Sequence, residues 1–320
     1  MHKGIKSFSM TGNNPIDQIP PLIKLVGFII LAIIMSIASF SVGYGALWLL
    51  FDIDLSNTDL INNYSDPDSI RNLKVIQLAN SIGTFVLPPF FFVWLIRANP
   101  AEYLRLNTKT APINFLLAAV MMIAAMPLIN WMVGINEQMV LPEALSGIEN
   151  WMRESEIKAK ELTEAFLFMD GPGDLLINIG LVALIPALGE ELFFRGVVQR
   201  LCIRGFANKH IGIWATAFLF SAIHMQFFGF FPRMILGAAL GYAFAWSGTL
   251  WVPIVAHFIN NAGAVIVSYL IGNGTISPDI ESIGANGTQE ILLVAGSLIV
   301  VAATMVGFHR FSPDRLVRPA

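Results

Sequence analysis

The chain alternates long apolar segments with short polar ones. A helix needs roughly 20 mostly apolar residues to cross the hydrocarbon core of a bilayer, and eight segments meet that requirement. They cover about 21–50, 75–97, 112–136, 174–202, 210–227, 232–248, 250–272 and 289–308. This pattern predicts an all-α, polytopic integral membrane protein with about eight transmembrane helices, folded as a single membrane domain over residues 1–320.

The one sizeable hydrophilic insertion covers residues 137–172. Within it, charged and apolar residues are mixed at helical spacing in LPEALSGIENWMRESEIKAKELTEAFLFM. A helix with one charged face and one apolar face lies in the membrane interface instead of crossing the bilayer. We therefore expect an amphipathic, extramembrane helix between the third and fourth spans.

Composition agrees with a membrane protein and excludes several other classes. The 320 residues are 55% hydrophobic and 13% charged, whereas soluble domains are about 25% charged. The net charge of −3 provides no basic surface for nucleic acid. The high hydrophobic fraction makes the lipid bilayer the expected environment. The single cysteine, Cys202, excludes an internal disulfide and a Cys-x-x-Cys metal pair.

Lysine and arginine are distributed unevenly along the predicted spans. With the N-terminus in the cytoplasm, 13 of the 19 lie in inner segments and 6 in outer ones. Cytoplasmic loops carry the excess of these residues. The distribution therefore predicts a multi-pass protein with both termini in the cytoplasm.

The polar side chains that stand out inside the predicted spans lie in the C-terminal half. Each ionisable residue costs about 2.5–3.5 kcal/mol at the centre of a membrane helix, so it is a functional candidate. These side chains are Glu190, Glu191 and Arg195 in the fourth segment, His224 in the fifth, and His257, Asn260 and Asn261 in the seventh. Their distribution predicts one site built by three spans.

Helix geometry separates the three charges of the fourth span. Glu191 and Arg195 are four residues apart, so they share a face and form an i, i+4 ion pair. Glu190 points about 100° away from Glu191 and needs a partner from another helix. Pro186 removes a backbone hydrogen bond one turn earlier, and we expect it to kink the helix beside Glu190.

The polar residues of the three spans can together activate a water molecule. A carboxylate accepts the proton of the water, an imidazole orients it, and His and Asn N–H groups stabilise an oxyanion. These groups can hydrolyse an amide without a covalent intermediate. The set Glu190, His224 and His257 could instead hold a zinc ion, which binds imidazole nitrogen and carboxylate oxygen.

Other interpretations of the same residues belong to different functional classes. A lone histidine in a membrane helix more often makes a helix–helix hydrogen bond than a catalytic contact. In a proton-coupled transporter, acids and histidines relay protons, but such proteins often show internal repeats with broken helices in both halves. A non-catalytic membrane immunity protein or scaffold is the third alternative.

Three short stretches resemble the motifs of the CPBP family of intramembrane proteases. They are EELFFR at 190–195, FSAIH at 220–224 and HFINN at 257–261, which match Glu-Glu-x-x-x-Arg, Phe-x-x-x-His and His-x-x-x-Asn. The family includes the CAAX prenyl endopeptidase and bacteriocin-processing proteases. The resemblance covers roughly residues 175–272, which we interpret as the protease core.

The resemblance implies a role for each residue of the motifs in a polar intramembrane cavity. It implies that Glu190 activates the water, His224 holds it, and His257 with Asn261 forms the oxyanion site. Glu191, Arg195 and Phe220 then have supporting roles. Members of the family have been described as metalloproteases and as metal-independent glutamate proteases. We favour the glutamate mechanism over Zn²⁺, because Asn261 is a good oxyanion donor and an uncommon zinc ligand.

The resulting hypothesis is a membrane-embedded endopeptidase that hydrolyses a peptide bond near the membrane surface. A prenylated protein, a leader peptide or a membrane protein segment would each fit as its substrate. One detail is difficult, because His224 lies near the outer end of the fifth span and Glu190 lies deeper. Either the fifth span begins deeper than its hydropathy indicates, or the MQFFGFFPR stretch continues within the protein at membrane depth.

Overall fold

The computed structural model describes residues 15–54, 60–61, 63–285 and 290–311. The predicted all-α fold is confirmed, since every regular element among these residues is helical. The N-terminal half comprises η1 (Pro15–Gln18), α1 (Pro21–Phe51), α2 (Pro67–Ser81), η3 (Ile82–Val86), α3 (Leu87–Leu95), α4 (Pro100–Tyr103), α5 (Ile113–Glu137), η4 (Glu143–Leu145) and α6 (Ser146–Leu167).

The C-terminal half begins with one long helix, residues 172–206, which contains two π-helical segments. Its parts are α7 (Pro172–Asn178), η5 (Ile179–Leu184), α8 (Ile185–Glu191), η6 (Leu192–Val198) and α9 (Gln199–Phe206). The remaining elements are α10 (Lys209–Ala222), α11 (Phe230–Ser247), α12 (Trp251–Gly272), η7 (Pro278–Ser282) and α13 (Ile291–Phe311).

Six of these helices are long and apolar enough to cross a membrane. They are Pro21–Phe51, Pro67–Leu95, Ile113–Glu137, Pro172–Phe206, Trp251–Gly272 and Ile291–Phe311. The other two predicted spans correspond to α10 and α11, which have 14 and 18 residues. The total of eight spans therefore stays a prediction, whereas a multi-pass membrane protein is supported by the six.

The length of α10 explains the depth of His224. Asn208 caps the start of α10 by accepting hydrogen bonds from the backbone N–H groups of His210 and Ile211, as Asn commonly does at this position. Fourteen residues of helix extend only about 21 Å. α10 thus ends before the far side of the bundle, and His224 lies just after its last residue.

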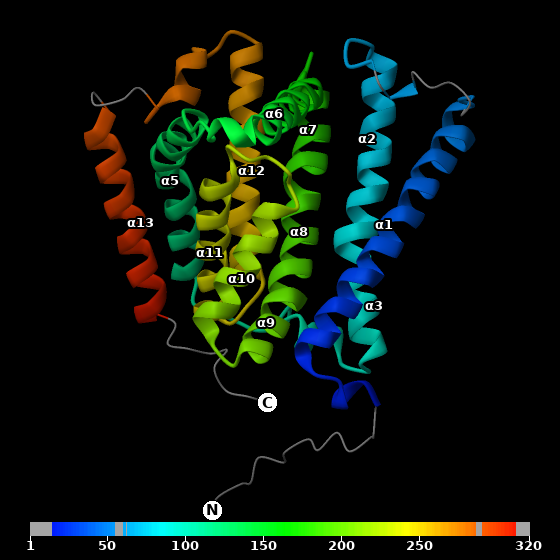
Figure 1. Cartoon of the computed structure of the whole chain (residues 1–320), viewed down its shortest axis with the longest axis vertical. Coiled ribbons are helices and arrows are strands. Elements are labelled where there is room, and N and C mark those ends of the chain that lie inside the picture. The colour runs from blue at the N-terminus through cyan, green and yellow to red at the C-terminus, as the bar shows by residue number, and fades with distance from the viewer. Residues whose placement is uncertain (1–14, 55–59, 62, 286–289, 312–320) are drawn as a thin grey trace, which may run out of the picture.

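Residues 223–229 form the connection from α10 to α11 and lie beneath α6 (Figure 1). The ring of Trp151 on α6 contacts the ring of Phe227 at 5.0 Å, and the Arg153 guanidinium lies 5.3 Å from the ring centre of Phe228. Residues 223–229 are thus irregular backbone packed against α6, which agrees with the second explanation, while their depth in the membrane stays a prediction.

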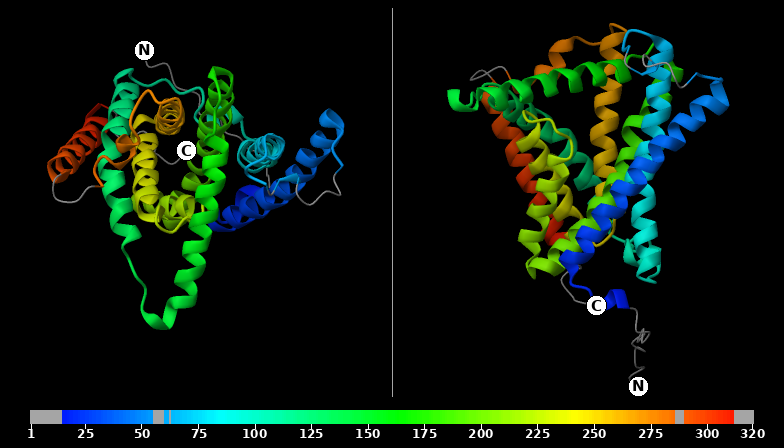
Figure 2. Two further views of the ribbon diagram at one scale, coloured as in Figure 1. Left: turned by 90° about the horizontal axis from the view of Figure 1, so that it is seen from above. Right: turned by 45° about the vertical axis from the view of Figure 1, so that its right-hand side comes forward.

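α6 crosses one end of the bundle at a steep angle to the other long helices (Figures 1 and 2). The amphipathic helix predicted within 137–172 is therefore present, and Ala165 is its one buried residue among those described. At the opposite end, α1 begins and α13 finishes on the same side of the bundle (Figure 1). The orientation count included Lys3, Lys6, Arg315 and Arg318, which lie outside the described residues.

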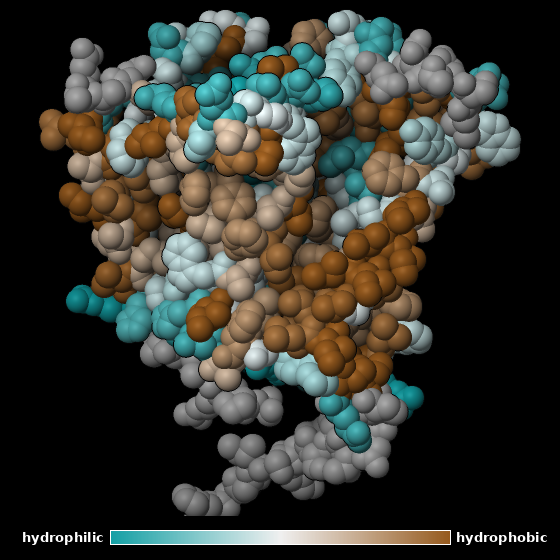
Figure 3. Space-filling view, in the orientation of Figure 1, coloured by the Kyte–Doolittle hydropathy of each residue, from teal (hydrophilic) through white to brown (hydrophobic). Residues whose placement is uncertain are grey.

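The outer surface of the bundle is apolar over its middle and polar at its ends (Figure 3). Large apolar side chains are exposed along whole helix faces, including Ile23, Val26, Ile30, Ile33, Ile34 and Ile37 on α1. Monomeric soluble proteins rarely expose apolar patches larger than a few hundred Å². This surface is the one expected of helices that face lipid.

Candidate functional site

The two adjacent glutamates lie on the long helix 172–206 between its two π-helical segments. Residues 179–184 precede them and residues 192–198 follow them. Single π turns inside α-helices occur frequently at functional sites, because the extra residue displaces backbone groups from the regular hydrogen-bond ladder. The neighbouring Gly189 packs so closely on η3 that an added Cβ would lie 2.9 Å from the Cβ of Phe85.

Glu191 and Arg195 form the predicted i, i+4 ion pair. The Nη1 atom of Arg195 donates to Oε1 of Glu191 at 2.8 Å, and both side chains are fully buried. The Nη2 atom of Arg195 donates to the backbone carbonyl of Gly237 on α11 at 2.9 Å. This pair therefore connects helix 172–206 to α11.

His257 on α12 lies between the two glutamates. Its Nδ1 atom is 2.9 Å from Oε1 of Glu191, and its Nε2 atom is 3.9 Å from Oε2 of Glu190. A carboxylate only accepts hydrogen bonds, so with Glu191 ionised the Nδ1 atom carries the proton and Nε2 points toward Glu190. The separation of 3.9 Å is longer than a direct hydrogen bond.

The two glutamates differ in their access to solvent. The side chain of Glu190 is 13% exposed, whereas that of Glu191 is 0% exposed. Glu191 also has two partners, Arg195 and His257. Of the two carboxylates, only Glu190 combines accessible surface with a position not fixed by a direct hydrogen bond among the described residues.

Phe220 joins the second motif to the first and third. Its ring lies 4.8 Å below the Arg195 guanidinium and contacts the imidazoles of His224 and His257 at centroid distances of 5.2 and 6.1 Å. The backbone carbonyl of Phe220 accepts a hydrogen bond from Nδ1 of His224 at 2.8 Å. Since a carbonyl only accepts, the neutral form of His224 has its lone pair on Nε2.

The side chain of Asn261 contacts a backbone carbonyl near Pro186, and the missing N–H of this proline helps to explain the contact. In an α-helix the N–H of residue 186 would donate to the carbonyl of Val182, but proline has no N–H. The side-chain nitrogen of Asn261 on α12 donates to this carbonyl at 3.2 Å. Asn260 in turn donates to the side-chain oxygen of Asn261 at 3.1 Å.

The predicted residues thus lie together, although not all of them touch. Glu191, Arg195, His257, Phe220 and His224 form a continuous set of contacts, with Glu190 beside His257. No hydrogen bond among the described residues joins Glu190 to His224 or to Asn261. His224 lies just after the end of α10 and contacts Phe220, whereas Asn261 on α12 contacts the carbonyl of Val182 in η5.

Arg233 is a member of the site that the sequence did not reveal. The sequence placed it at the outer end of the predicted span 232–248, and it lies in the first turn of α11, where its charge acts on Glu190 and on Glu156 of α6. Its Nη2 atom donates to the side-chain oxygen of Gln226 at 2.5 Å. The signal available in the sequence was an arginine inside an otherwise apolar helix.

Among the described residues, those proposed as zinc ligands are not gathered into one metal-binding group. Within the described part of the chain, no group of three or more His, Cys, Asp or Glu side chains could hold a metal ion. His257 and His224 each use Nδ1 for a partner, Glu191 and the backbone of Phe220, which leaves Nε2 as the ring nitrogen that could bind a metal. Zinc sites require at least three such ligands converging on one point.

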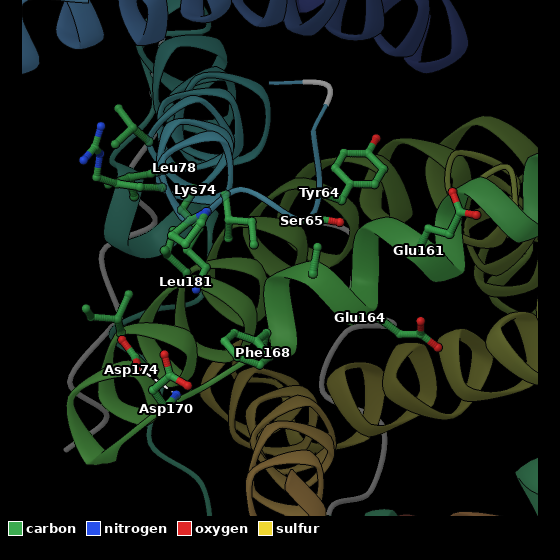
Figure 4. Close-up of a pocket in the computed structure, with 16 residues that line it drawn as sticks. Tyr64, Ser65, Lys74, Leu78, Glu161, Glu164, Phe168, Asp170, Asp174 and Leu181 are labelled. Carbon is green, nitrogen blue, oxygen red and sulfur yellow. Dashed lines mark hydrogen bonds between the residues drawn. The ribbon is translucent and has the colours of Figure 1, made fainter. Parts of the chain in front are cut away.

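A separate cavity of about 910 Å³ lies between α2, α6 and α7 (Figure 4). Charged side chains from three elements line it, including Lys74 on α2, Glu161 and Glu164 on α6, and Asp174 on α7. None of the motif residues lines this cavity. It is therefore a second cavity, with charged groups set among apolar side chains, distinct from the candidate site.

Comparisons with known proteins match one part of the chain to a family and find one relative. Residues 172–263 match the family model described as type II CAAX prenyl endopeptidase Rce1-like. An uncharacterized Bacillus subtilis protein, YpbD, is 35% identical over 89 residues, which are 27% of this chain and 42% of that protein. The match thus spans less than half the length of this relative. No solved structure shows a significant match.

Proposed function

We propose that this membrane protein is an endopeptidase whose water is activated by Glu190, because residues 172–263 match the type II CAAX prenyl endopeptidase Rce1-like family model. The observation that carries the proposal is the difference between the adjacent carboxylates, one 13% exposed and the other fully buried and paired. We further propose that the protease core covers residues 175–272 and that both termini are cytoplasmic.

In the first step, Glu190 accepts a proton from a water molecule while the water oxygen attacks the carbonyl carbon of the substrate. A carboxylate at hydrogen-bond distance from the water is the geometric requirement for this role. Nε2 of neutral His224 carries a lone pair, so it can accept the second hydrogen of the water and orient it. The product of the step is a tetrahedral intermediate with one negative oxygen.

The negative oxygen is stabilised by donors that the fold holds in place. Asn261 has two N–H groups, one of which is bonded to Val182, so the second can donate to the oxyanion. His257 can donate from Nε2 when it is the imidazolium, a form suited to its place between Glu191 and Glu190. Each such donor contributes about 2.7–4 kcal/mol to transition-state stabilisation in well-studied hydrolases.

In the last step, the carbon–nitrogen bond breaks and Glu190 returns its proton to the leaving amine. Water supplies the hydroxyl of the new carboxyl group, so no other reactant is consumed. The buried Glu191–Arg195 pair supports this chemistry indirectly, because it fixes His257 on one side and Gly237 on the other. The substrate is a peptide or protein, and the family suggests a prenylated C-terminal motif.

The test is cleavage by purified protein in liposomes. The substrates are a farnesylated peptide ending in Cys-aliphatic-aliphatic-Xaa and any peptide whose terminus changes in cells that lack the protein. We expect Glu190→Gln to lower kcat at least about 100-fold, a typical effect of losing a general base. Glu164→Gln, in the separate cavity, is the matched control and should retain wild-type activity.

Two outcomes would contradict the proposal. Equal cleavage by wild type and Glu190→Gln would remove Glu190 from the reaction. Loss of activity on chelation, together with stoichiometric bound zinc, would favour the metal-dependent version of the protease.

A further inference from the structure

Asn260 lies next to the proposed oxyanion donor but belongs to none of the three motifs. Its side-chain nitrogen is 3.1 Å from the side-chain oxygen of Asn261, and no ionisable group intervenes. The same residue lines a cavity of about 370 Å³ between α5, α12 and η7. Asn260 therefore lies between the cavity on one side and the Asn261 amide on the other.

The orientation of the Asn261 amide follows from the chemistry of its neighbour. The oxygen and nitrogen of an Asn side chain are hard to distinguish by shape alone, so the hydrogen-bond partners decide which atom lies where. Val182 presents a backbone carbonyl, which can only accept. The atom of Asn261 that faces Val182 at 3.2 Å must therefore be the nitrogen.

This assignment determines what Asn260 must do. With the nitrogen of Asn261 directed at Val182, its oxygen faces Asn260. An acceptor in that place needs a donor, so Asn260 presents its own NH₂ group. The amide plane of Asn261 is then fixed at both ends, and the direction of its second N–H is determined.

We infer that Asn260 is a positioning residue that fixes the amide of Asn261 for oxyanion binding, a role that rests on the proposed function. The chain of contacts runs from Asn260 through Asn261 to the carbonyl that lacks its α-helical donor because of Pro186. Without the donor at 260, the oxygen of Asn261 loses a fixed partner, and its second N–H is no longer held in one direction.

The surroundings of Asn260 allow this to be tested by substitution. Its side chain borders an open cavity, so a smaller or isosteric side chain neither clashes nor opens a new void in a packed core. Asn260→Asp keeps the shape but replaces the donor by an acceptor. Asn260→Ala removes the donor without adding charge, and Asn260→Ser keeps a shorter donor.

The expected effect lies in kcat and depends on Asn261. Loss of one hydrogen bond of about 0.5–1.5 kcal/mol corresponds to roughly a 2- to 13-fold fall in kcat. We expect this fall for Asn260→Ala, a larger one for Asn260→Asp and a smaller one for Asn260→Ser, with KM changed less than about twofold. In an Asn261→Ala background, Asn260→Ala should have no further effect, as in a double-mutant cycle of two residues that act as one unit.

A second readout keeps the test independent of the substrate. In protein labelled with ¹⁵N-asparagine in detergent micelles, the side-chain resonances of Asn261 are identified by their loss in Asn261→Ala. They should shift or broaden in Asn260→Ala. This measurement does not require activity, so it separates failure of the positioning role from failure of the proposed hydrolysis.

Three results would overturn the positioning role. One is an effect of Asn260→Ala that multiplies with that of Asn261→Ala instead of vanishing. Another is a fall in thermal stability with unchanged kcat, which would make Asn260 a packing residue only. The last is an Asn261 resonance that does not respond to substitution of Asn260.

Discussion

Two Glu-x-x-x-Arg pairs in this protein have the same spacing in the sequence and the same ion-pair distance, but they lie in different surroundings. Glu191 and Arg195 on helix 172–206 are 2.8 Å apart, and so are Glu149 and Arg153 on α6. In the first pair both side chains are 0% exposed, whereas in the second Arg153 is 41% exposed and Glu149 16%. The local sequence thus sets the contact, and the tertiary structure sets its surroundings.

The difference shows in the additional partners of each pair. On α6, Arg153 directs two nitrogens at one oxygen of Glu149, and the other oxygen accepts from the backbone N–H of Leu141. In the buried pair, Arg195 and Glu191 each use a second contact to reach another helix. Burying two charges costs several kcal/mol per ion, so the buried pair is understood better as the support of His257 than as a source of stability.

The largest expected effect is that of Arg195→Ala. It leaves the Glu191 carboxylate buried beside His257 without its cation, which costs about 3–5 kcal/mol when a fully buried pair is broken. We expect a lower yield of folded protein, a lower unfolding temperature in detergent and loss of activity. Unchanged thermal stability would show that the pairing is unimportant to the fold.

Arg195→Lys should have an intermediate effect. A lysine keeps the charge but lacks the planar fork with which Arg195 reaches both Glu191 and the carbonyl of Gly237. One buried acceptor then loses its donor, at a cost of about 1–3 kcal/mol. Thermal unfolding of wild type, Arg195→Lys and Arg195→Ala, measured side by side, tests this order. Equal unfolding temperatures for wild type and Arg195→Lys would contradict the prediction.

Arg153→Ala is the matched substitution in the exposed pair. Exposed ion pairs contribute little, because solvent screens the charges and two long side chains lose freedom. We expect an unfolding temperature close to that of wild type and retained catalytic activity. A fall in unfolding temperature as large as that of Arg195→Ala would contradict this. It would mean that α6 and the loop beneath it contribute more to stability than the exposure of the pair suggests.

The smallest expected effect is a local response to acid. The hydrogen bonds from Arg153 and from the N–H of Leu141 lower the pKa of Glu149 from its usual 4.5. A carboxyl group with a depressed pKa stabilises the folded state above its unfolded pKa, and this contribution is lost as the pH falls through the folded value. Below pH 4.5 we therefore expect faster proteolysis near residue 141, with no such pH response in Glu149→Gln.

Features that depend on local spacing could be predicted from the sequence. The Glu191–Arg195 pair and the amphipathic helix that became α6 both follow from 3.6-residue periodicity. Apolar segment length likewise predicted the six long spans.

Features that depend on contacts between distant residues could not be predicted. The length of α10 was hidden because apolar residues continue past Ala222 into the connection that carries His224. Arg233 was not recognised as a site residue because hydropathy does not show that α6 covers the region. The contact of Asn261 with Val182 joins residues 79 apart, beyond the range of any helical pattern.

Those separations also determine the order in which the protein can be completed during synthesis. The partners of Arg195, Glu191 and Val182 lie 42, 66 and 79 residues further along the chain. At about 5–20 residues per second, the ribosome needs roughly 4–16 s to proceed from Val182 to Asn261. During that interval helix 172–206 carries Glu190, Glu191 and Arg195 without the partners that α11 and α12 later supply.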